Sequence, residues 1–209
     1  MDYGTSDFIA MFRAIARSMN ENRDQLCALD GVIGDADHGI AMQQGFGAVE
    51  NALDALDAAA SPTDVFNTAA KAFLNAVGAS SGPLYATAMM RAGATLKGKA
   101  AASAEDVALL IPAMTKGIAD RGKAVPGDKT MLDAWTAASD RVVSLLGSGT
   151  AILSAAADAA AAGAEATKPL EAKMGRAARL GARSVGHMDP GAASAALMIR
   201  AMAEALKGA

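Results

Sequence analysis

The chain has 209 residues, which is enough for one well-buried core and does not require a second domain. Aromatic residues make up only 4%, and Ala, Leu and Met dominate the hydrophobic 52%, which favours helices over strands. The net charge of -3, without a clustered Lys/Arg stripe, argues against a nucleic-acid partner. We therefore expect a single all-α domain over residues 1–209.

No segment of the sequence is typical of export or of a bilayer span. The first residues combine early acidic side chains with an interrupted apolar pattern, unlike a secretory signal. The single Cys27 cannot form an intramolecular disulfide. Asp158 and Glu165 interrupt the longest alanine-rich run. We expect a cytoplasmic protein that does not bind membranes.

Apolar residues at a 3.6-residue period predict eight amphipathic helices. The spacing is clearest from Phe8 to Met19 and from Val107 to Ile118, where the apolar residues share one face. Clusters of Gly, Pro and polar residues mark the connections. The expected helices span 6–29, 38–58, 62–77, 83–97, 103–121, 130–146, 150–165 and 190–207.

The connections are mostly short, which favours antiparallel neighbours in an up-and-down barrel or bundle. Every second connection should then lie at the same end. One end would hold the loops 30–37, 78–82, 122–129 and 167–189. The plainer loops near residues 60, 100 and 148 would lie at the other end. Because the first four loops contain nearly all the unusual residues, we expect the functional site at their end.

Three aspartates, Asp30, Asp35 and Asp37, lie within the eight residues of the first loop. Clustered carboxylates repel one another unless a cation neutralises them, and Mg²⁺ prefers oxygen ligands and completes its shell with water and phosphates. Taken singly, Asp35 or Asp37 could instead cap the helix expected to begin near His38. An EF-hand does not fit the spacing, and two His and one Cys do not favour zinc. The trio together predicts a magnesium site that also holds phosphate.

The next two loops, and the end of the fourth, lead into helix starts that suit anions. Ser81 lies just before Pro83, Thr130 and Asp133 have the spacing of a capping box, and Asp189 precedes a proline. Each pattern is also that of a plain helix cap. Amides exposed at such starts can nevertheless receive phosphate oxygens, so their position beside the aspartates favours phosphate binding.

The loop 167–189 is long for a compact domain, and loops of this length often act as lids. Its basic residues could face phosphates or simply be solvated. They are Lys168, Lys173, Arg176, Arg179 and Arg183. We expect Arg176 to be the one that faces the site. Of the two histidines, His38 adjoins the aspartates and is expected to contact phosphate, whereas His187 could simply brace the turn before the last helix.

Four segments together resemble the nucleotide-binding L subunit of dihydroxyacetone kinase, and the similarity runs nearly end to end. They are LDGVIGDADHG, GASSGPLYATAMMRAG, RGKAVPGDKTMLDAW and MGRAARLGARSVGHMDPGA. The resemblance implies an eight-helix barrel of antiparallel helices, with ADP or ATP and two Mg²⁺ ions bound at one end.

The resemblance also assigns roles to individual positions. It implies that Asp30, Asp35 and Asp37 are the metal ligands. The positions that match the family's nucleotide-lining residues are His38, Gly39, Ile40, Ala41, Ser80, Ser81, Gly122, Met131, Arg176, Asp189 and Pro190. Ala41 departs from the more usual polar residue at its position, which removes one possible side-chain contact to phosphate.

The activity implied by the resemblance is phosphoryl transfer from ATP to dihydroxyacetone. The acceptor would be held by a separate K subunit, and a phosphocarrier M subunit of the phosphotransferase system would rephosphorylate the bound ADP. Two alternatives remain. The chain could serve a kinase for a related ketose or tetrose that uses free ATP. It could also be a non-catalytic module whose Met-rich helices enclose an apolar ligand or lipid.

Overall fold

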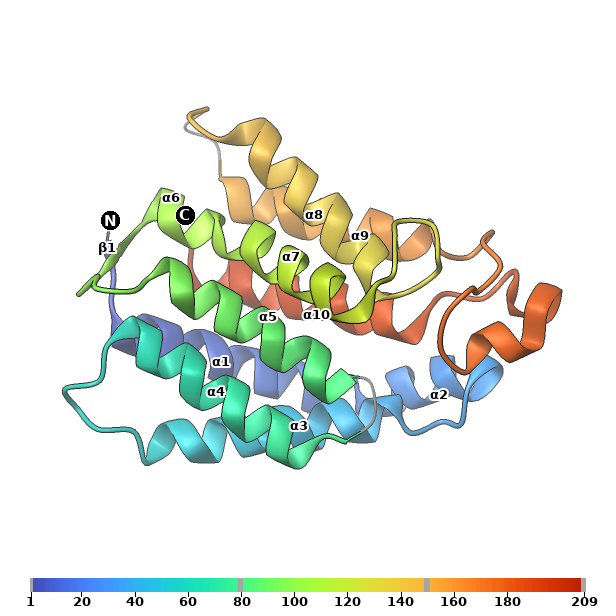
Figure 1. Ribbon diagram of the computed structural model, residues 1–209, viewed down its shortest axis with the longest axis horizontal. Helices are drawn as coiled ribbons and strands as arrows, with labels where there is room; N and C mark the ends of the chain where they lie inside the picture. Colours follow the sequence, from blue (N-terminus) through green and yellow to red (C-terminus); the bar gives the residue numbers. More distant parts are fainter. Residues whose placement is uncertain (1, 79–80, 149–150, 208–209) are drawn as a thin grey trace.

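The computed structural model describes residues 2–78, 81–148 and 151–207, and they form an almost entirely helical molecule (Figure 1). The described residues contain ten α-helices: α1 (Thr5–Glu21), α2 (Arg23–Ile33), α3 (His38–Asp54), α4 (Pro62–Ala76), α5 (Ser81–Thr95), α6 (Ala104–Ala108), α7 (Leu110–Gly122), α8 (Met131–Leu145), α9 (Ile152–Glu165) and α10 (Pro190–Ala205). A 3₁₀ helix, η1 (Ala177–Ser184), lies in the long loop before α10. The prediction of an all-α fold is confirmed.

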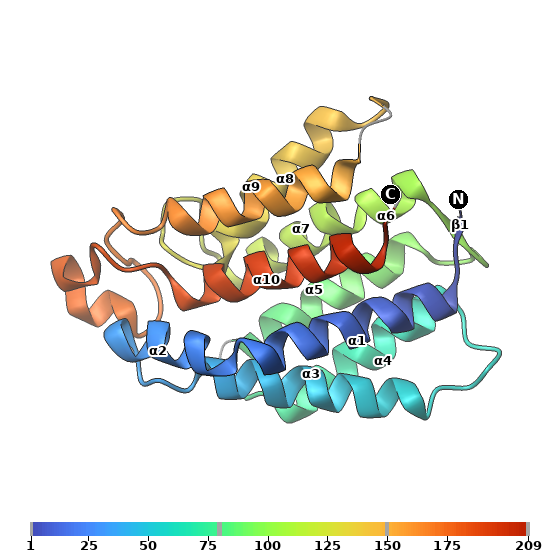
Figure 2. The same cartoon turned by 180° about the vertical axis from the view of Figure 1, so that it is seen from behind.

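Eight of these helices pack side by side into a closed ring. Going around the ring, the order is α1, α3, α4, α5, α7, α8, α9 and α10, and α10 packs against α1 again. The chain runs to and fro along the long axis of the molecule, so neighbours in the ring are antiparallel (Figures 1 and 2). The ring encloses the core, which includes the fully buried side chains of Trp135, Tyr85, Phe46 and Phe73.

The predicted number of eight helices is wrong, because two of the predicted helices are broken. The helix expected over 6–29 divides at Asn22, whose side-chain amide donates to the Ser18 carbonyl at 2.8 Å. The helix expected over 103–121 divides at Leu109. Here Pro112 is the cause, because it has no N–H to donate to the Ala108 carbonyl and its ring would collide with that carbonyl in a continuous helix.

The helical region also extends further than predicted, which changes the setting of the first aspartate. The sequence predicted that Asp30 lies in a loop, but α2 continues to Ile33, so Asp30 belongs to the last turns of a helix. Leu26, Asp30 and Ile33 are the buried residues of α2, and their three- and four-residue spacing puts them on one helical face. The carboxylate of Asp30 is therefore held on a rigid element.

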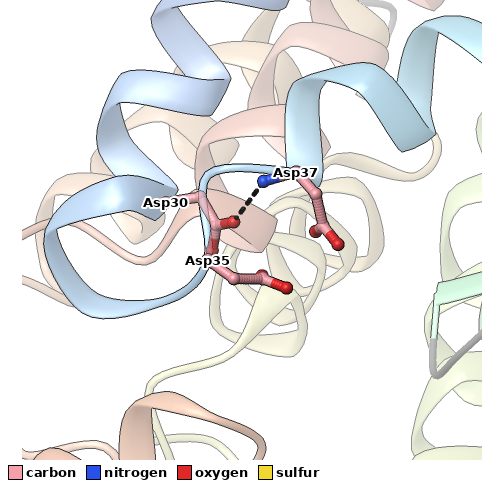
Figure 3. Close-up of side chains that lie close together, drawn as sticks. All are labelled: Asp30, Asp35 and Asp37. Atoms are coloured by element: carbon pink, nitrogen blue, oxygen red, sulfur yellow. Dashed lines mark hydrogen bonds between the residues drawn. The ribbon is translucent and has the colours of Figure 1, made fainter.

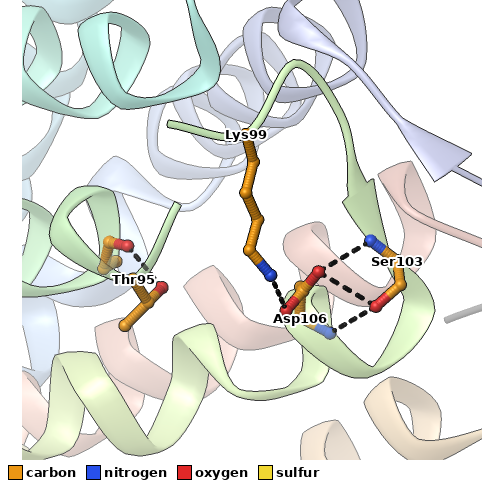
Figure 4. Close-up of polar contacts among 5 residues, drawn as sticks. Thr95, Lys99, Ser103 and Asp106 are labelled. Atoms are coloured by element: carbon orange, nitrogen blue, oxygen red, sulfur yellow. Dashed lines mark hydrogen bonds and ion pairs between the residues drawn. The ribbon is translucent and has the colours of Figure 1, made fainter. Parts of the chain in front are cut away.

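The end of the ring where α6 lies is stabilised by polar contacts between residues close in sequence (Figure 4). The Ser103 hydroxyl accepts from the Asp106 amide at 3.2 Å, and the Asp106 carboxylate accepts from the Ser103 amide at 3.0 Å, which makes a capping box for α6. Lys99 also donates to Asp106 at 2.5 Å, and this bond, together with those from Ser103, lowers the pKa of the Asp106 carboxyl. These contacts explain the local structure without a ligand.

Two short strands close the same end. β1 (Asp2–Tyr3) pairs antiparallel with β2 (Ala102–Ser103), which joins the start of the chain to the connection between α5 and α6. Among the described residues, no helix has both the length and the apolar character needed to cross a bilayer.

Candidate functional site

A cavity of about 720 Å³ opens at the end of the ring where α2 and η1 lie. Its walls include residues from all four of the connections that the sequence placed together or from the helix ends beside them, namely from 30–38, 76–78 with 81–83, 121–130 and 174–191. The predicted grouping of these connections is therefore observed. The cavity has the size of a small-molecule site.

The three aspartates converge on this cavity (Figure 3). One carboxylate oxygen from each of Asp30, Asp35 and Asp37 lies within 4.8 Å of the others. Asp30 is buried on α2, whereas Asp35 and Asp37 are exposed on the turn that leads to α3. An arrangement of one rigid and two more accessible carboxylates can bind a cation while leaving positions for further ligands.

The carboxylate of Asp30 is fixed by the backbone around it. Its Oδ2 accepts hydrogen bonds from the amides of Asp37 at 3.0 Å and His38 at 3.3 Å. The turn between them passes through Ala36, which has a φ of 62°, a left-handed conformation that costs free energy for any residue with a Cβ. The turn thus places the Asp37 backbone against the Asp30 carboxylate.

Gly34 makes this close return possible. A Cβ on Gly34 would lie only 2.2 Å from Asp30 Oδ1, which is an overlap. The Gly34 amide also donates to the Asp30 carbonyl at 2.5 Å and ends α2. The requirement for glycine at this position comes from the space that the carboxylate occupies.

Arg176 faces the aspartates from the long loop before α10. Its Nη1 forms an ion pair with Asp35 Oδ2 and lies 3.5 Å from Asp37 Oδ2. The guanidinium is therefore the positive charge that this cluster attracts from within the chain. An all-oxygen donor set of three carboxylates that already attracts a cationic group fits a hard divalent cation such as Mg²⁺.

Four helices begin at the cavity. Residues of the first turns of α3, α5, α8 and α10 line it, and the first turn of a helix contains amides that have no partner within the helix. Helix N-termini carry partial positive charge and favour anions, phosphate groups above all. Carboxylates that attract cations and helix ends that attract anions therefore lie side by side, as an ion-bridged phosphate requires.

Asp189 caps the last of these helices, where its carboxylate accepts from the Ala192 amide at 2.7 Å. Burial raises the pKa of Asp189 to about 7, and the nearby carboxylates of Asp133 and Asp30 act in the same direction. Lys129 and the hydrogen bond from Ala192 oppose this rise in pKa. Burial is thus the main reason why this carboxyl retains its proton at higher pH than an ordinary one.

His38 is oriented by a contact across the ring. Its Nε2 lies 2.9 Å from the Ser194 hydroxyl on α10, and that hydroxyl donates to the Gly191 carbonyl at 3.0 Å. Burial lowers the pKa of His38, and the charge of Asp30 partly opposes this. Because the Ser194 proton goes to Gly191, a neutral imidazole donates to Ser194 through Nε2–H and keeps Nδ1 as an acceptor.

Most of the residues singled out from the sequence line the cavity. They are Asp30, Asp35, Asp37, His38, Ala41, Ser81, Gly122, Met131, Arg176, Asp189 and Pro190. Gly39 is instead packed against α2, where a Cβ would lie 2.0 Å from the Arg23 carbonyl oxygen. Ile40 is exposed and does not line the cavity. Ser80 lies outside the described residues.

Sequence reasoning missed several residues of the cavity. Gln44 lies on α3 beyond the aspartate turn, Arg121 lies at the end of α7, and Lys129 immediately precedes the N-cap of α8. Lys129 was overlooked because a lysine beside a capping threonine is an ordinary surface residue in sequence. Its two unusual properties, burial and a φ of 61°, exist only in the folded chain.

Comparison with protein families identifies the fold that carries this cavity. The model of the DAK2 domain matches residues 32–204. This chain belongs to the DAK2 domain family. The predicted resemblance to kinase L subunits is confirmed as well. This chain is 40% identical to the ADP-binding subunit DhaL of PEP-dependent dihydroxyacetone kinase 1 from Listeria innocua, over 88% of each chain.

Longer proteins contain the same domain. This chain is 36% identical to L-erythrulose 1-kinase of Mycolicibacterium smegmatis, with 96% of this chain matched to 35% of the relative. It also matches the crystal structure of the dihydroxyacetone kinase from C. freundii in complex with AMP-PNP and Mg²⁺, with a TM-score of 0.72 and 27% identity. That match covers 98% of this chain and 34% of the other.

Proposed function

We propose that this chain is the ADP-binding subunit of a dihydroxyacetone kinase, in which it holds ADP or ATP with two Mg²⁺ ions at one end of its helical barrel. The observation that carries the proposal is the convergence of three carboxylates and four helix N-termini on one cavity. This combination suits a metal-bound polyphosphate. It is supported by the DhaL relative, whose length is almost entirely matched, and by the solved kinase that contains AMP-PNP and Mg²⁺.

Asp30, Asp35 and Asp37 would hold the ions. Bound Mg²⁺ would supply charge neutralisation across the phosphate oxygens, which is the main requirement of phosphoryl transfer. The first-turn amides of α3, α5, α8 and α10 would position the phosphates, with Ser81 and His38 as side-chain partners. Met131 and Gly122 would lie beside the base and ribose. Arg176 would leave its ion pairs with Asp35 and Asp37 and contact the phosphates when metal takes its place.

The acceptor and the phosphate donor would be presented by other chains. We propose a K subunit that holds dihydroxyacetone and a phosphocarrier M subunit of the phosphotransferase system that rephosphorylates the bound ADP. Relatives matched over nearly their whole length support this assembly, since their names describe PEP- or PTS-dependent kinases and an ADP-binding subunit. On this proposal the chain itself needs neither a nucleophile nor a general base.

A second candidate has its own support. The match to L-erythrulose 1-kinase and to D-erythrulose kinase, both from Mycolicibacterium smegmatis, favours a kinase for a four-carbon ketose. On this second proposal the donor would be free ATP. The residues that would select the acceptor do not belong to this chain, so the proposed nucleotide site is compatible with both.

The test is to purify the chain and measure bound nucleotide and magnesium by mass spectrometry and elemental analysis, then binding of Mg-ADP by calorimetry. Tight Mg-ADP binding is expected. Failure to bind it under any magnesium concentration would overturn the proposal, and a co-purified lipid without nucleotide would support an apolar-ligand module instead. Phosphorylation of dihydroxyacetone against erythrulose, with a phosphocarrier or with ATP, would then separate the two candidates.

A further inference from the structure

Lys129 is unusual both in its burial and in its backbone conformation. Its side chain is only 1% exposed, although lysine is almost never fully buried, and its backbone has a φ of 61°, which residues with a side chain rarely adopt. It lies directly before the N-cap of α8. Buried charges must be paired or hydrogen-bonded, so the partners of its ammonium group are informative.

The ammonium group donates to two backbone carbonyls that are far apart in sequence. Its Nζ lies 2.8 Å from the Thr167 oxygen and 2.5 Å from the His187 oxygen. Thr167 follows the end of α9, and His187 precedes α10. The two ends of the long segment 167–189 are therefore bonded to one buried cation.

Thr167 completes this junction from the other side. Its hydroxyl accepts from the Asp189 amide at 3.0 Å and donates to the Ala164 carbonyl at 2.6 Å, and its side chain is fully buried. The cation thus lies near the last carbonyls of α9, where the helix dipole favours positive charge. Burial lowers the pKa of Lys129, while the charges of Asp189 and Asp133 oppose that change.

Neighbouring contacts carry the support further along the segment toward Arg176. The Asp128 carbonyl accepts from the Lys173 amide at 3.1 Å, and the Asp128 carboxylate lies 3.6 Å from the Lys173 ammonium. Within the segment, the Ser184 hydroxyl accepts from the Ala172 amide at 2.9 Å. Residues 128 and 129 therefore support the segment at its ends and at the position three residues before Arg176.

We propose that Lys129 is a positioning residue that holds segment 167–189 as a preformed lid and so places Arg176 over the three aspartates. The proposal deepens the proposed function, because the object under the lid would be the metal-bound nucleotide. Lys129 acts through the two carbonyls, and both of its observed hydrogen bonds go to the backbone of the lid. Loss of these bonds should therefore loosen the lid.

The first test needs no ligand. Lys129→Met keeps much of the apolar stem and removes the donors, and Lys71→Met is the matched control, because Lys71 is exposed on α4. Hydrogen exchange of amides in 169–188 should be roughly tenfold faster in Lys129→Met, the order expected for a lost buried hydrogen bond. Exchange in α4 and α5 should not change, and Lys71→Met should match the native protein. Unchanged exchange in 169–188 would overturn the proposal.

The second test follows the release of a fluorescent N-methylanthraniloyl ADP with Mg²⁺ in stopped-flow experiments. A loosened lid should raise the dissociation rate roughly tenfold and leave the association rate nearly unchanged, whereas general misfolding would reduce the fraction of active sites. Lys129→Arg, which keeps cationic donors, should restore part of the slow release and of the exchange protection.

The outcomes separate the two proposals. If the native protein binds no Mg-ADP while exchange in 169–188 still depends on Lys129, the proposed function fails and the structural role of Lys129 stands. If Lys129→Met does not fold, Lys129→Arg decides the matter. Native-like protection of 169–188 in Lys129→Arg supports the proposal, and protection lost equally throughout the protein contradicts it.

Discussion

Gly34 lies at the end of α2, against the carboxylate of Asp30. Because an added Cβ would lie 2.2 Å from Asp30 Oδ1, Gly34→Ala must displace either the carboxylate or the turn. We expect Mg-ADP affinity to fall about 10- to 100-fold, as for other residues that orient metal ligands, with the helix content unchanged. Calorimetry and circular dichroism measure the two effects.

Gly47 provides the matched control for this substitution. It lies within α3, and an added Cβ would meet nothing within 4 Å. Gly47→Ala should therefore keep native Mg-ADP affinity and raise the free energy of unfolding by up to about 1 kcal/mol. Native Mg-ADP affinity in Gly34→Ala would contradict the role assigned to the Asp30 carboxylate.

Asp189 gives the protein a pH dependence whose sign follows from its raised pKa of about 7. The folded state retains this proton at pH values where the unfolded state has lost it, so the free energy of unfolding should fall as pH rises from the ordinary carboxyl pKa toward about 7. Asp189→Asn keeps a cap acceptor for Ala192 and cannot ionise. In metal-free buffer it should flatten this fall between about pH 5 and pH 7.

Chemical denaturation at several pH values measures the effect, with Asp140→Asn, an exposed position on α8, as the control. The control should retain the native pH dependence. A variant Asp189→Asn whose free energy of unfolding changes with pH as steeply as that of the native protein would show that another group is responsible.

At the scale of elements, we expect Arg176 in segment 167–189 to have opposite effects on the affinities for Mg²⁺ and for Mg-ADP. The guanidinium occupies the charge-neutralising position beside Asp35 and Asp37. Arg176→Ala should therefore strengthen binding of Mg²⁺ alone and weaken binding of Mg-ADP, each by about fivefold for a partly exposed pair. Calorimetric titrations with the metal and with the nucleotide separate the two. A parallel loss of both affinities would contradict the exchange of partners.

Arg179→Ala is the control for this experiment, because Arg179 is an exposed residue of η1 in the same segment. It has no ion pair to the aspartates, so neither affinity should change. The comparison separates the position of Arg176 from the general positive charge of the segment.

The order of the elements could be predicted from sequence, because the 3.6-residue period and the Gly and Pro clusters are local properties. The break at Leu109 had a local signal in Pro112, but the break at Asn22 did not, since asparagine is only a mild helix breaker. The aspartate trio was found because its residues are adjacent in sequence. Gly34 and Lys129 were not, since their importance depends on the atoms that the fold brings against them.

At the scale of the whole molecule, three exposed valines lie in elements at the end of the ring that contains the cavity. Val32, Val125 and Val185 are 52%, 57% and 42% exposed. Val32 lies in the last turn of α2, Val125 in the connection between α7 and α8, and Val185 between η1 and α10. Under the proposed function this end must face the chain that holds the acceptor. Val125→Asp should lower the rate with the K subunit by at least about threefold, while Mg-ADP affinity stays native.

Val143 offers an equally exposed control, also at 57%, in the last turn of α8 at the other end. Val143→Asp should change neither the steady-state rate with the K subunit nor Mg-ADP affinity. If Val125→Asp has the same rate as Val143→Asp, the partner does not contact this side of the mouth.

The closure of the end opposite the cavity has a consequence for how the domain can be combined with others. The Tyr3 hydroxyl lies 3.5 Å from the Leu206 carbonyl oxygen, so the start of the chain and the end of α10 are neighbours there (Figures 1 and 2). A linker leaving from either side of this junction would point away from the cavity. Gene fusion can therefore join the domain to another module without covering the cavity. In the longer relatives, a region similar to this chain makes up about a third of the polypeptide.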